Sequence, residues 1–430
     1  MPLRLDTRDP GFAAAFAALV DGRREADADV SRDVAAIVAA VRGHGDAALA
    51  EYTRRFDRHD LDVSGWRIEP ADCAAALAAL DPGLRTALDL AATRIRAYHA
   101  GQRPADSSRT DEAGVRMGAR WGAVEAAGLY VPGGRAAYPS SVLMNAIPAK
   151  VAGVDRLVMV TPTPDGLVNP LVLAAAALAG VDEVWRVGGA QAIAALAYGT
   201  ERIRPVDVIV GPGNAWVAEA KRQLYGVVGI DMVAGPSEIV VVADGDNDPT
   251  WIAADLLSQA EHDPTSQSIL FTDDAAFADA VAAAVEVQLG QLGTGATARA
   301  SWEANGAIIT VASLREVPAL SDRLAPEHLE LAVADPQALF DRVRHAGSVF
   351  LGRYAPEAVG DYVAGPNHVL PTGRRARFAS GLSVLDFMKR TSFIALDAAA
   401  IAAIGPAAVA LANAEGLPAH AASVAARLDG

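Results

Sequence analysis

The sequence predicts an α/β protein that contains two doubly wound parallel sheets. Short β-branched segments alternate with alanine-rich helical segments, and several of the predicted strands end in glycine-rich turns. Strands that are buried on both faces and separated by helices are typical of parallel sheets. At 430 residues the chain is also too long for one ordinary hydrophobic core, so we expect more than one domain.

The N-terminal part is predicted to be mainly helical. Apolar residues recur at helical spacing in residues 33–41 and 84–91. Cys73 lies in a similar pattern, where a small apolar residue fits, so we expect it to be structural. A polar stretch at residues 102–110 is followed by a β-rich passage that ends at Tyr130.

Two sets of alternating strands and helices follow. The first set has predicted strands at residues 156–160, 183–187 and 206–210, and the second at residues 238–243, 268–271, 308–311 and 347–351. We expect the two units to divide near residue 236. The tail is predicted to be alanine-rich helix. Because it is too short to form its own core, it must pack on something else, such as another subunit.

Glycines follow three of the predicted strands, after Tyr130, Val187 and Val210. Backbone amides in such turns can approach phosphates, and ligands of open α/β sheets bind at the carboxyl ends of strands. The full GxGxxG fingerprint is absent, because Trp216 stands where its third glycine would follow Gly211. Tight turns without a ligand therefore remain an alternative.

Composition excludes several classes of protein. The net charge of -15 and the absence of a basic block argue against nucleic-acid binding. No apolar run reaches the roughly 18 residues of a membrane span, and no secretory signal is visible at the start, so we expect a soluble cytoplasmic protein. The single cysteine excludes an internal disulfide and a thiolate-rich metal site. Any metal must therefore be held by nitrogen and oxygen.

An amide and an imidazole lie three residues apart at the end of a predicted helix. Residues 251–257 have helical apolar spacing, and Pro264 disfavours helical geometry before it, so Gln259 and His262 share one face of the last turn. This arrangement can aim two ligands at one metal ion. The alternative is a helix end at which His262 only meets the negative end of the dipole.

Four of the eight histidines lie in short polar stretches, and we take these as the functional candidates: His262, His328, His368 and His420. The other four, His44, His59, His99 and His345, lie in or beside helical or arginine-rich stretches, where we expect solvated side chains. Glu327 precedes His328 at the entrance of a predicted strand. An imidazole that titrates near neutral pH and a neighbouring carboxylate can serve two proton transfers that need groups of different base strength. The pair therefore indicates acid and base catalysis.

Gln259, His262, Asp361 and His420 together would provide two nitrogen and two oxygen ligands. Such a set suits a divalent ion such as zinc or manganese that stays open to substrate, rather than a structural zinc, which is usually sulfur-rich. A zinc hydrolase that uses Glu327 as its base is an alternative, but it leaves the glycine turns unexplained. A metal-stabilised binding module is another, and the Glu327-His328 pair argues against it.

The chain resembles the histidinol dehydrogenase family over nearly its whole length. The resemblance rests on eight blocks: Tyr130-Val131-Pro132-Gly133-Gly134, Gly188-Gly189-Ala190-Gln191-Ala192, Gly211-Pro212-Gly213-Asn214, residues 230–238, residues 255–262, Pro326-Glu327-His328-Leu329-Glu330, Gly360-Asp361-Tyr362 and Asn367-His368-Val369-Leu370-Pro371. It implies an enzyme that uses two NAD molecules in turn to oxidise L-histidinol, through the aldehyde, to L-histidine.

The resemblance also implies residue roles. Glu327 and His328 would be the catalytic bases, and zinc would be the metal, with manganese or cobalt as substitutes. The implied zinc ligands are Gln259, His262, Asp361 and His420, and the implied NAD contacts are Tyr130, Gln191 and Asn214. The implied substrate contacts are Ser237, Gln259, His262, Glu327, His328, Asp361, His368, Glu415 and His420. Relatives that oxidise another polar alcohol, such as sulfopropanediol, are the nearest alternative, but His368 and Glu415 favour histidinol.

The resemblance finally implies an interrupted architecture of two incomplete Rossmann-like units in a homodimer. Residues 130–236 would form an NAD-binding unit inserted in a larger globule, which is made of residues 25–129 and 237–382 and carries the metal and the catalytic residues. Residues 1–24 would be an arm that contacts the partner. Residues 383–430 would be a helical tail that brings Glu415 and His420 to the partner's site.

Overall fold

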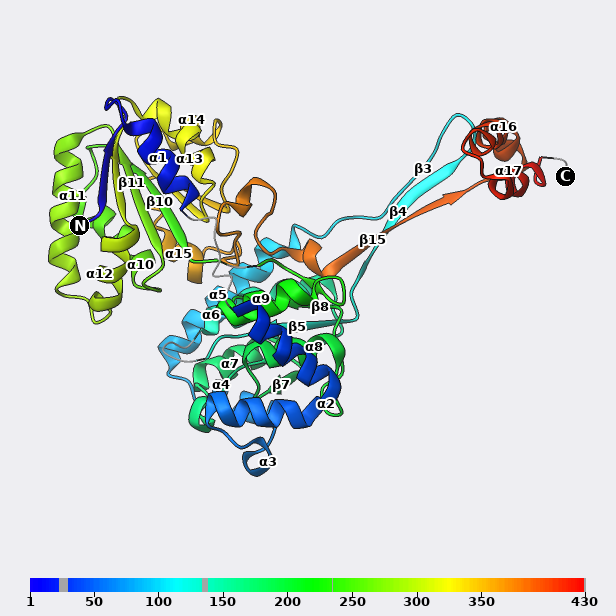
Figure 1. Cartoon of the computed structure of the whole chain (residues 1–430), viewed down its shortest axis with the longest axis horizontal. Helices are drawn as coiled ribbons and strands as arrows, with labels where there is room; N and C mark the ends of the chain where they lie inside the picture. Colours follow the sequence, from blue (N-terminus) through cyan, green and yellow to red (C-terminus); the bar gives the residue numbers. More distant parts are fainter. Residues whose placement is uncertain (23–29, 134–137, 234, 429–430) are drawn as a thin grey trace.

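The computed structural model describes residues 1–22, 30–133, 138–233 and 235–428. In it the chain forms two α/β units and a long arm that projects away from both (Figure 1). We call them the first unit, which contains the sheet around β5, and the second unit, which contains the sheet around β10. No helix among the described residues is long and apolar enough to cross a membrane.

The sheet of the first unit has six strands in the order β2-β7-β6-β5-β8-β9. All its pairings are parallel except that of β2 with β7. Its strands are β2 (Arg67–Ile68), β5 (Ala126–Tyr130), β6 (Arg156–Val160), β7 (Glu183–Trp185), β8 (Val208–Val210) and β9 (Gly229–Ile230). The predicted α/β class and the parallel sheet are thus confirmed.

Helices from two parts of the chain cover this sheet. They are α2 (Ser31–Asp57), α3 (Leu61–Ser64), α4 (Pro70–Ala78), α5 (Pro82–Ala100), α6 (Pro139–Ala152), α7 (Pro170–Ala179), α8 (Gly189–Tyr198) and α9 (Ala215–Leu224). The predicted grouping of residues 25–129 with residues 237–382 differs from this packing, because α2 packs on α8 and α9, α4 on α7, and α5 on α6. Ile37 and Leu196, for example, share one apolar core. Burial of these helical apolar faces against the first sheet decides the grouping.

The sheet of the second unit is parallel throughout, in the order β1-β12-β11-β10-β13-β14. Its strands are β1 (Leu3–Asp6), β10 (Glu238–Ala243), β11 (Gln267–Thr272), β12 (Ala307–Thr310), β13 (His328–Ala332) and β14 (Ser348–Leu351). Its helices are α1 (Phe12–Asp21), α10 (Pro249–Ala260), α11 (Ala275–Leu289), α12 (Gly295–Asn305), α13 (Val317–Leu324), α14 (Pro336–Phe340) and α15 (Glu357–Tyr362).

The N-terminal segment that we expected to be an arm is part of this second sheet. β1 pairs with β12, and Phe16 of α1 packs its ring on Phe271 of β11. The expected boundary between residues 24 and 25 lies outside the described residues. A contact of this segment with a partner subunit stays a prediction.

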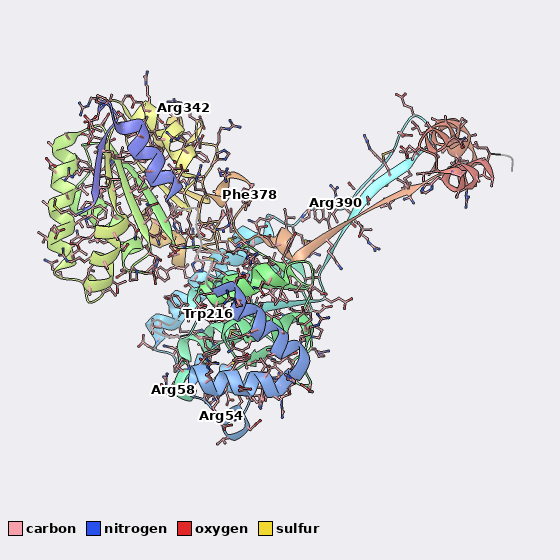
Figure 2. The ribbon with its side chains drawn as sticks, viewed as in Figure 1. Arg54, Arg58, Trp216, Arg342, Phe378 and Arg390 are labelled. Atoms are coloured by element: carbon pink, nitrogen blue, oxygen red, sulfur yellow. The ribbon has the colours of Figure 1, made fainter. Side chains whose placement is uncertain are left out.

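The arm is an antiparallel sheet of three strands that carries two helices at its tip (Figure 1). Its strands are β3 (Ser107–Thr110), β4 (Arg116–Ala123) and β15 (Met388–Ala395), in the order β15-β4-β3, and its helices are α16 (Ala398–Ala414) and α17 (Pro418–Ala425). The prediction of helix from residue 383 onward is therefore wrong for its first part, because β15 pairs with β4. Arg390 projects from β15 away from the ribbon, and most residues of β15 are exposed (Figure 2).

Two of the crossings of the chain between the two units frame the candidate site. Met232 packs in the core of the first unit, whereas Glu238 begins β10 of the second. Further on, Asp361 belongs to α15 of the second unit, and Val369 packs again in the first unit's core.

Candidate active site

A pocket of about 310 Å³ lies between the two units. The first unit contributes the turn after β8, including Gly211 and Asn214, and also Tyr138 and Ser141 near the start of α6. The second unit contributes six of the residues that the sequence singles out: Ser237, Gln259, His262, Glu327, His328 and Asp361. A seventh, His368, lies in the segment that returns to the first unit. The structure thus brings together polar side chains from the starts of β10 and β13 and from the ends of α10 and α15.

The remaining predicted site residues lie elsewhere. Tyr130 and Gln191 are buried at the carboxyl end of the first sheet, where the Tyr130 hydroxyl accepts a hydrogen bond of 3.2 Å from the Gly189 amide. Glu415 caps the end of α16 and His420 lies on α17, so both are at the tip of the arm, far from the pocket of their own chain (Figure 1).

Glu327 and His328 are held by the same backbone residue of the neighbouring strand. The Glu238 amide donates to Glu327 Oε2 at 2.9 Å, and the Glu238 carbonyl lies 3.0 Å from His328 Nδ1. A carbonyl can only accept, so the proton of the neutral imidazole must be on Nδ1. The lone pair of Nε2 is then free, and this atom has no hydrogen-bond partner among the described residues.

Burial sets the protonation of this pair. Removal from water raises the pKa of Glu327 well above its usual value, and the nearby Glu238, Asp361 and Glu357 carboxyls raise it further. Burial lowers the pKa of His328 to about 4. His328 is therefore a neutral imidazole with an available Nε2 at neutral pH, which is the form that a general base requires.

The residues proposed from sequence as metal ligands offer suitable donor atoms. Gln259 Oε1 is buried and has no hydrogen-bond partner within the described part of the chain, while Gln259 Nε2 lies 2.9 Å from His262 Nδ1. Asp361 Oδ1 lies 3.7 Å from His368 Nδ1 in the same pocket. An unsatisfied amide oxygen beside an imidazole and a carboxylate fits a divalent ion with nitrogen and oxygen ligands.

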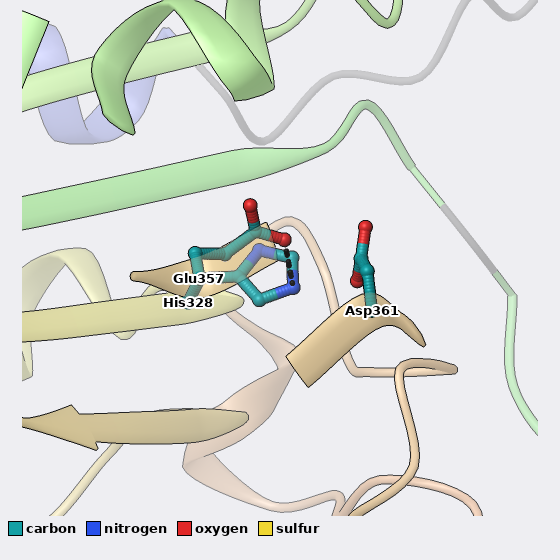
Figure 3. A group of neighbouring side chains, drawn as sticks. All are labelled: His328, Glu357 and Asp361. Carbon is teal, nitrogen blue, oxygen red and sulfur yellow. Dashed lines mark ion pairs between the residues drawn. The ribbon is translucent and has the colours of Figure 1, made fainter. Parts of the chain in front are cut away.

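A second group of possible ligands includes a residue that sequence analysis missed. Atoms of His328, Glu357 and Asp361 lie within 4.8 Å of one another, and His328 Nε2 is 3.5 Å from Glu357 Oε1 (Figure 3). Burial and Asp361 raise the pKa of Glu357 to about 8. Glu357 stands four residues before Asp361, which places both side chains on one face of the helix. This spacing could have identified Glu357 as a site candidate from the sequence.

Two more buried carboxyls lie behind this group. Burial raises the pKa of Glu330 on β13 to about 9 and that of Asp255 on α10 to about 6, and the two carboxyls are hydrogen-bonded to each other. Neither residue stood out in the sequence, because each follows an ordinary helical or strand pattern.

The turn after β8 is held by a buried ion pair. The Asp231 carboxylate accepts from the amides of Gly211 at 2.8 Å and Met232 at 2.6 Å, and Lys221 Nζ contacts both Asp231 and the Gly211 carbonyl. Gly211 has φ +110, and a Cβ there would lie 2.2 Å from the Tyr130 carbonyl oxygen. Only glycine can occupy this position. Asn214 lines the pocket and caps α9, with its side-chain oxygen accepting from the Trp216 and Val217 amides, so the start of α9 lies beside the pocket.

Two of the histidines that we expected to be solvated are buried. His59 is 5% exposed and His99 is fully buried, and burial lowers the pKa of each. His44 is exposed, as predicted. The sequence gives no sign of the tertiary contacts that cover His59 and His99.

Comparison with known proteins identifies similar chains. A family profile described as Histidinol dehydrogenase matches residues 21–428. The chain is 68% identical over 429 residues to a histidinol dehydrogenase of Zymomonas mobilis, with 100% of both chains covered, and 65% identical over 430 residues to one of Rhodospirillum rubrum, with 100% of this chain and 99% of the relative covered. The crystal structure of histidinol dehydrogenase from Elizabethkingia anophelis superimposes with a TM-score of 0.93 at 36% identity, covering 100% of this chain and 98% of that one.

Proposed function

Because this chain belongs to the histidinol dehydrogenase family of oxidoreductases, we propose that it oxidises L-histidinol through the aldehyde to L-histidine, with zinc and NAD as cofactors. The main support from the geometry is the Glu327-His328 pair, held by the backbone N–H and C=O of Glu238 in a pocket that also contains an unsatisfied amide oxygen. Two bases in different environments suit an oxidation in two steps.

We assign the zinc to Gln259, His262 and Asp361 of one chain and His420 of a second copy. Bound zinc would hold the imidazole and amine of the substrate in place, so its contribution is orientation. Ser237, His368 and Glu415, the last also from the second copy, would complete the contacts with the substrate. The free Oε1 of Gln259 and the nitrogen and oxygen character of the set support this assignment.

We assign the dinucleotide to the carboxyl end of the first sheet, with Tyr130, Gln191 and Asn214 as contacts. Bound NAD would accept the hydride in each step. The turn after β8 supports this assignment, because its glycine lets the backbone come close to a ligand and the start of α9 favours negative charge.

The two bases would act at different points. In the first step, His328 Nε2 takes the proton of the substrate hydroxyl as the carbon is oxidised. Once His328 has released that proton to solvent, Glu327 in its ionised form would take a proton from the water that adds to the aldehyde in the second step. His328 would then accept a proton again as the hydrate is oxidised. The buried position of both groups keeps other water away from these transfers.

We further propose a homodimer with shared sites. The tip of the arm carries Glu415 and His420, and the arm holds α16 and α17 away from the pocket of the same chain (Figure 1). A second copy is the simplest source of these two side chains. A two-fold dimer would complete both sites by the same contact.

Product stoichiometry tests the reaction. Purified enzyme should form two NADH for each L-histidinol consumed and should lose activity on prolonged chelation, with recovery on adding zinc. Sulfopropanediol serves as the comparison substrate. One NADH with release of free aldehyde would contradict the double oxidation, and activity that survives chelation would contradict the metal.

Complementation tests the shared site. His262→Asn and His420→Asn chains, each inactive alone, are unfolded and refolded together. A heterodimer would contain one intact and one doubly damaged site, and should recover up to about half of the activity per dimer by symmetry. If heterodimers form but stay inactive, the tail does not serve the partner.

A further inference from the structure

A short segment of the chain joins two of the residues assigned to the site. Asp361 lies near the end of α15 in the second unit, and His368 lies seven residues further on. The intervening residues 363–367 cross to the first unit, where Val369 is part of the apolar core. The position of both side chains thus depends on how this crossing segment is held.

Helix α5 of the first unit holds the start of the segment through one arginine. Arg94 Nε donates to the Val363 carbonyl at 2.6 Å, and Nη2 donates to the Ala364 carbonyl at 3.1 Å. A guanidinium is a rigid planar fork, so two bonds to consecutive carbonyls fix the direction of the backbone as well as its distance. Arg94 is exposed, so these bonds rather than burial of its stem are its main contribution.

The same helix holds the end of the segment through a buried imidazole. His99 Nδ1 lies 2.7 Å from Gln102 Oε1, and His99 Nε2 lies 3.4 Å from Asn367 Nδ2. An amide oxygen accepts and an amide nitrogen donates, so His99 is neutral with its proton on Nδ1. Asn367 Nδ2 also donates to the Met144 carbonyl at 2.6 Å, and Asn367 Oδ1 accepts from the Val369 amide at 2.9 Å.

Between these two points the backbone lies directly on α5. Gly365 has φ +111, and a Cβ there would lie 3.1 Å from the Arg94 carbonyl oxygen and 3.3 Å from the Tyr98 Cβ. The segment is therefore held to α5 at its start, middle and end.

From these contacts we infer that Arg94 and His99 are positioning residues that hold Asp361 and His368 in register with the rest of the pocket. The inference rests on the proposed function, because it assigns those two side chains to zinc and substrate. Neither Arg94 nor His99 touches the pocket; both act through the backbone of residues 363–367. Loss of the Arg94 fork should loosen the segment and weaken the hold on histidinol and on zinc. The turn that is assigned to NAD should be unaffected, because Lys221 and Asp231 hold it separately.

Arg94→Met tests this, because it keeps most of the side-chain length and removes the donors. We expect the KM for histidinol to rise and zinc loss to a chelator to accelerate, each by about 10- to 100-fold, as for other residues that support metal ligands. The KM for NAD should stay unchanged, and kcat should change less than the KM for histidinol. Arg94→Lys, which keeps one donor, should be intermediate. Arg96→Met is the matched control, an exposed arginine on the same helix, and should behave as wild type.

Hydrogen exchange provides a readout that does not depend on the reaction. The amides of residues 363–365, 367 and 368 should exchange faster in Arg94→Met than in Arg96→Met, in the protein without substrate. His99→Leu should have the same effect at Asn367 and His368, at some cost in thermal stability.

Unchanged exchange in Arg94→Met, or a normal KM for histidinol with a normal rate of zinc loss, would overturn the inference. A wild-type enzyme that does not oxidise histidinol would instead contradict the proposed function, while the exchange experiment would still test whether α5 holds the segment.

Discussion

The two six-stranded sheets face the pocket with opposite ends. The first sheet presents its carboxyl end, where Gly211 and Asn214 lead into the start of α9. The second sheet presents its amino end, where Glu238 and His328 begin their strands and α10 terminates beside Gln259. Helix starts carry partial positive charge and helix ends partial negative charge. One side of the pocket is therefore suited to an anionic dinucleotide, and the other to a cation.

The two sides also differ in whether their buried ionisable groups are paired with opposite charges. In the first unit the Lys221-Asp231 pair is nearly inaccessible, and each charge has its partner. In the second unit, Glu327, Glu330 and Glu357 are buried close to other carboxyls, and their pKa values are raised. Paired charge fixes a backbone, whereas raised carboxyl pKa values and neutral imidazoles provide groups that move protons. The comparison predicts that loss of the paired charge in the first unit changes stability, and that loss of Glu327 or His328 in the second unit changes chemistry.

The largest effect is expected at the two bases of the second unit. His328→Asn should slow oxidation of both histidinol and added histidinal by roughly 10² to 10⁴, the usual loss when a general base is removed. Glu327→Gln should slow histidinal oxidation more than the first hydride transfer, because only the second step needs activated water. Single-turnover formation of NADH from each substrate measures this, and small, equal effects would exclude the pair from the mechanism.

The next effect is expected at the ion pair of the first unit. Lys221→Met leaves Asp231 buried without its cation and should lower the free energy of unfolding by about 3–5 kcal/mol in denaturant titrations. Lys150→Met is the control, because the exposed pair of Lys150 with Asp182, 2.9 Å apart, should contribute about 1 kcal/mol or less. Lys221→Met combined with Asp231→Leu should recover part of the loss. Equal costs for the two lysines would show that burial of the pair is irrelevant.

A smaller effect is expected in the pH dependence of stability. The pKa of Glu330 rises from 4.5 to about 9 on folding, so the folded chain keeps a proton that the unfolded chain releases. This group therefore favours folding most below pH 4.5, and its contribution is lost as pH rises toward 9. The free energy of unfolding of Glu330→Gln should decline less over that range than that of wild type. Glu286 is exposed, so Glu286→Gln should keep the wild-type change of the free energy of unfolding with pH. If wild type, Glu330→Gln and Glu286→Gln all show the same change, the raised pKa of Glu330 is refuted.

The smallest effect is expected at Cys73. Its side chain is buried in the core of the first unit, and burial raises the pKa of its thiol, so it should be unreactive. Cys73→Ala should keep wild-type kinetics and lose about 1 kcal/mol of stability. Inactivation of the native enzyme by a thiol reagent at neutral pH would contradict a purely structural role.

The parallel strands could be predicted from sequence because their signal is local. Buried strands leave continuous β-branched runs, and each predicted strand from residue 156 to residue 351 is found to within two positions of its expected ends. The end of α10 and the start of β13 were equally readable, since Pro264 and the Glu327-His328 dipeptide mark them. The roles of these residues remain predictions.

The parts that escaped prediction depend on contacts between distant segments. β15 is a strand because β4 pairs with it, and its own residues carry no clear alternation of burial. His99 looks like a surface histidine of a helix until Asn367 covers it. The packing of α2 to α5 on the first unit depends on which apolar face lies nearest, which spacing along the chain does not specify.

The pairing of β1 with β12 has a consequence for the order in which the protein is made. Thr7 Oγ1 accepts from the Ala312 amide, 305 positions later in the chain. At roughly 5–20 residues per second, a ribosome needs on the order of 15–60 s to deliver the partner of the first strand. The first unit, whose strands are all made in between, can condense meanwhile. The apolar residues Phe16 and Val20 of α1 have no second sheet to pack on until β10, β11 and β12 have been made. During this interval the N-terminal segment of the nascent chain therefore exposes apolar residues that a chaperone can bind.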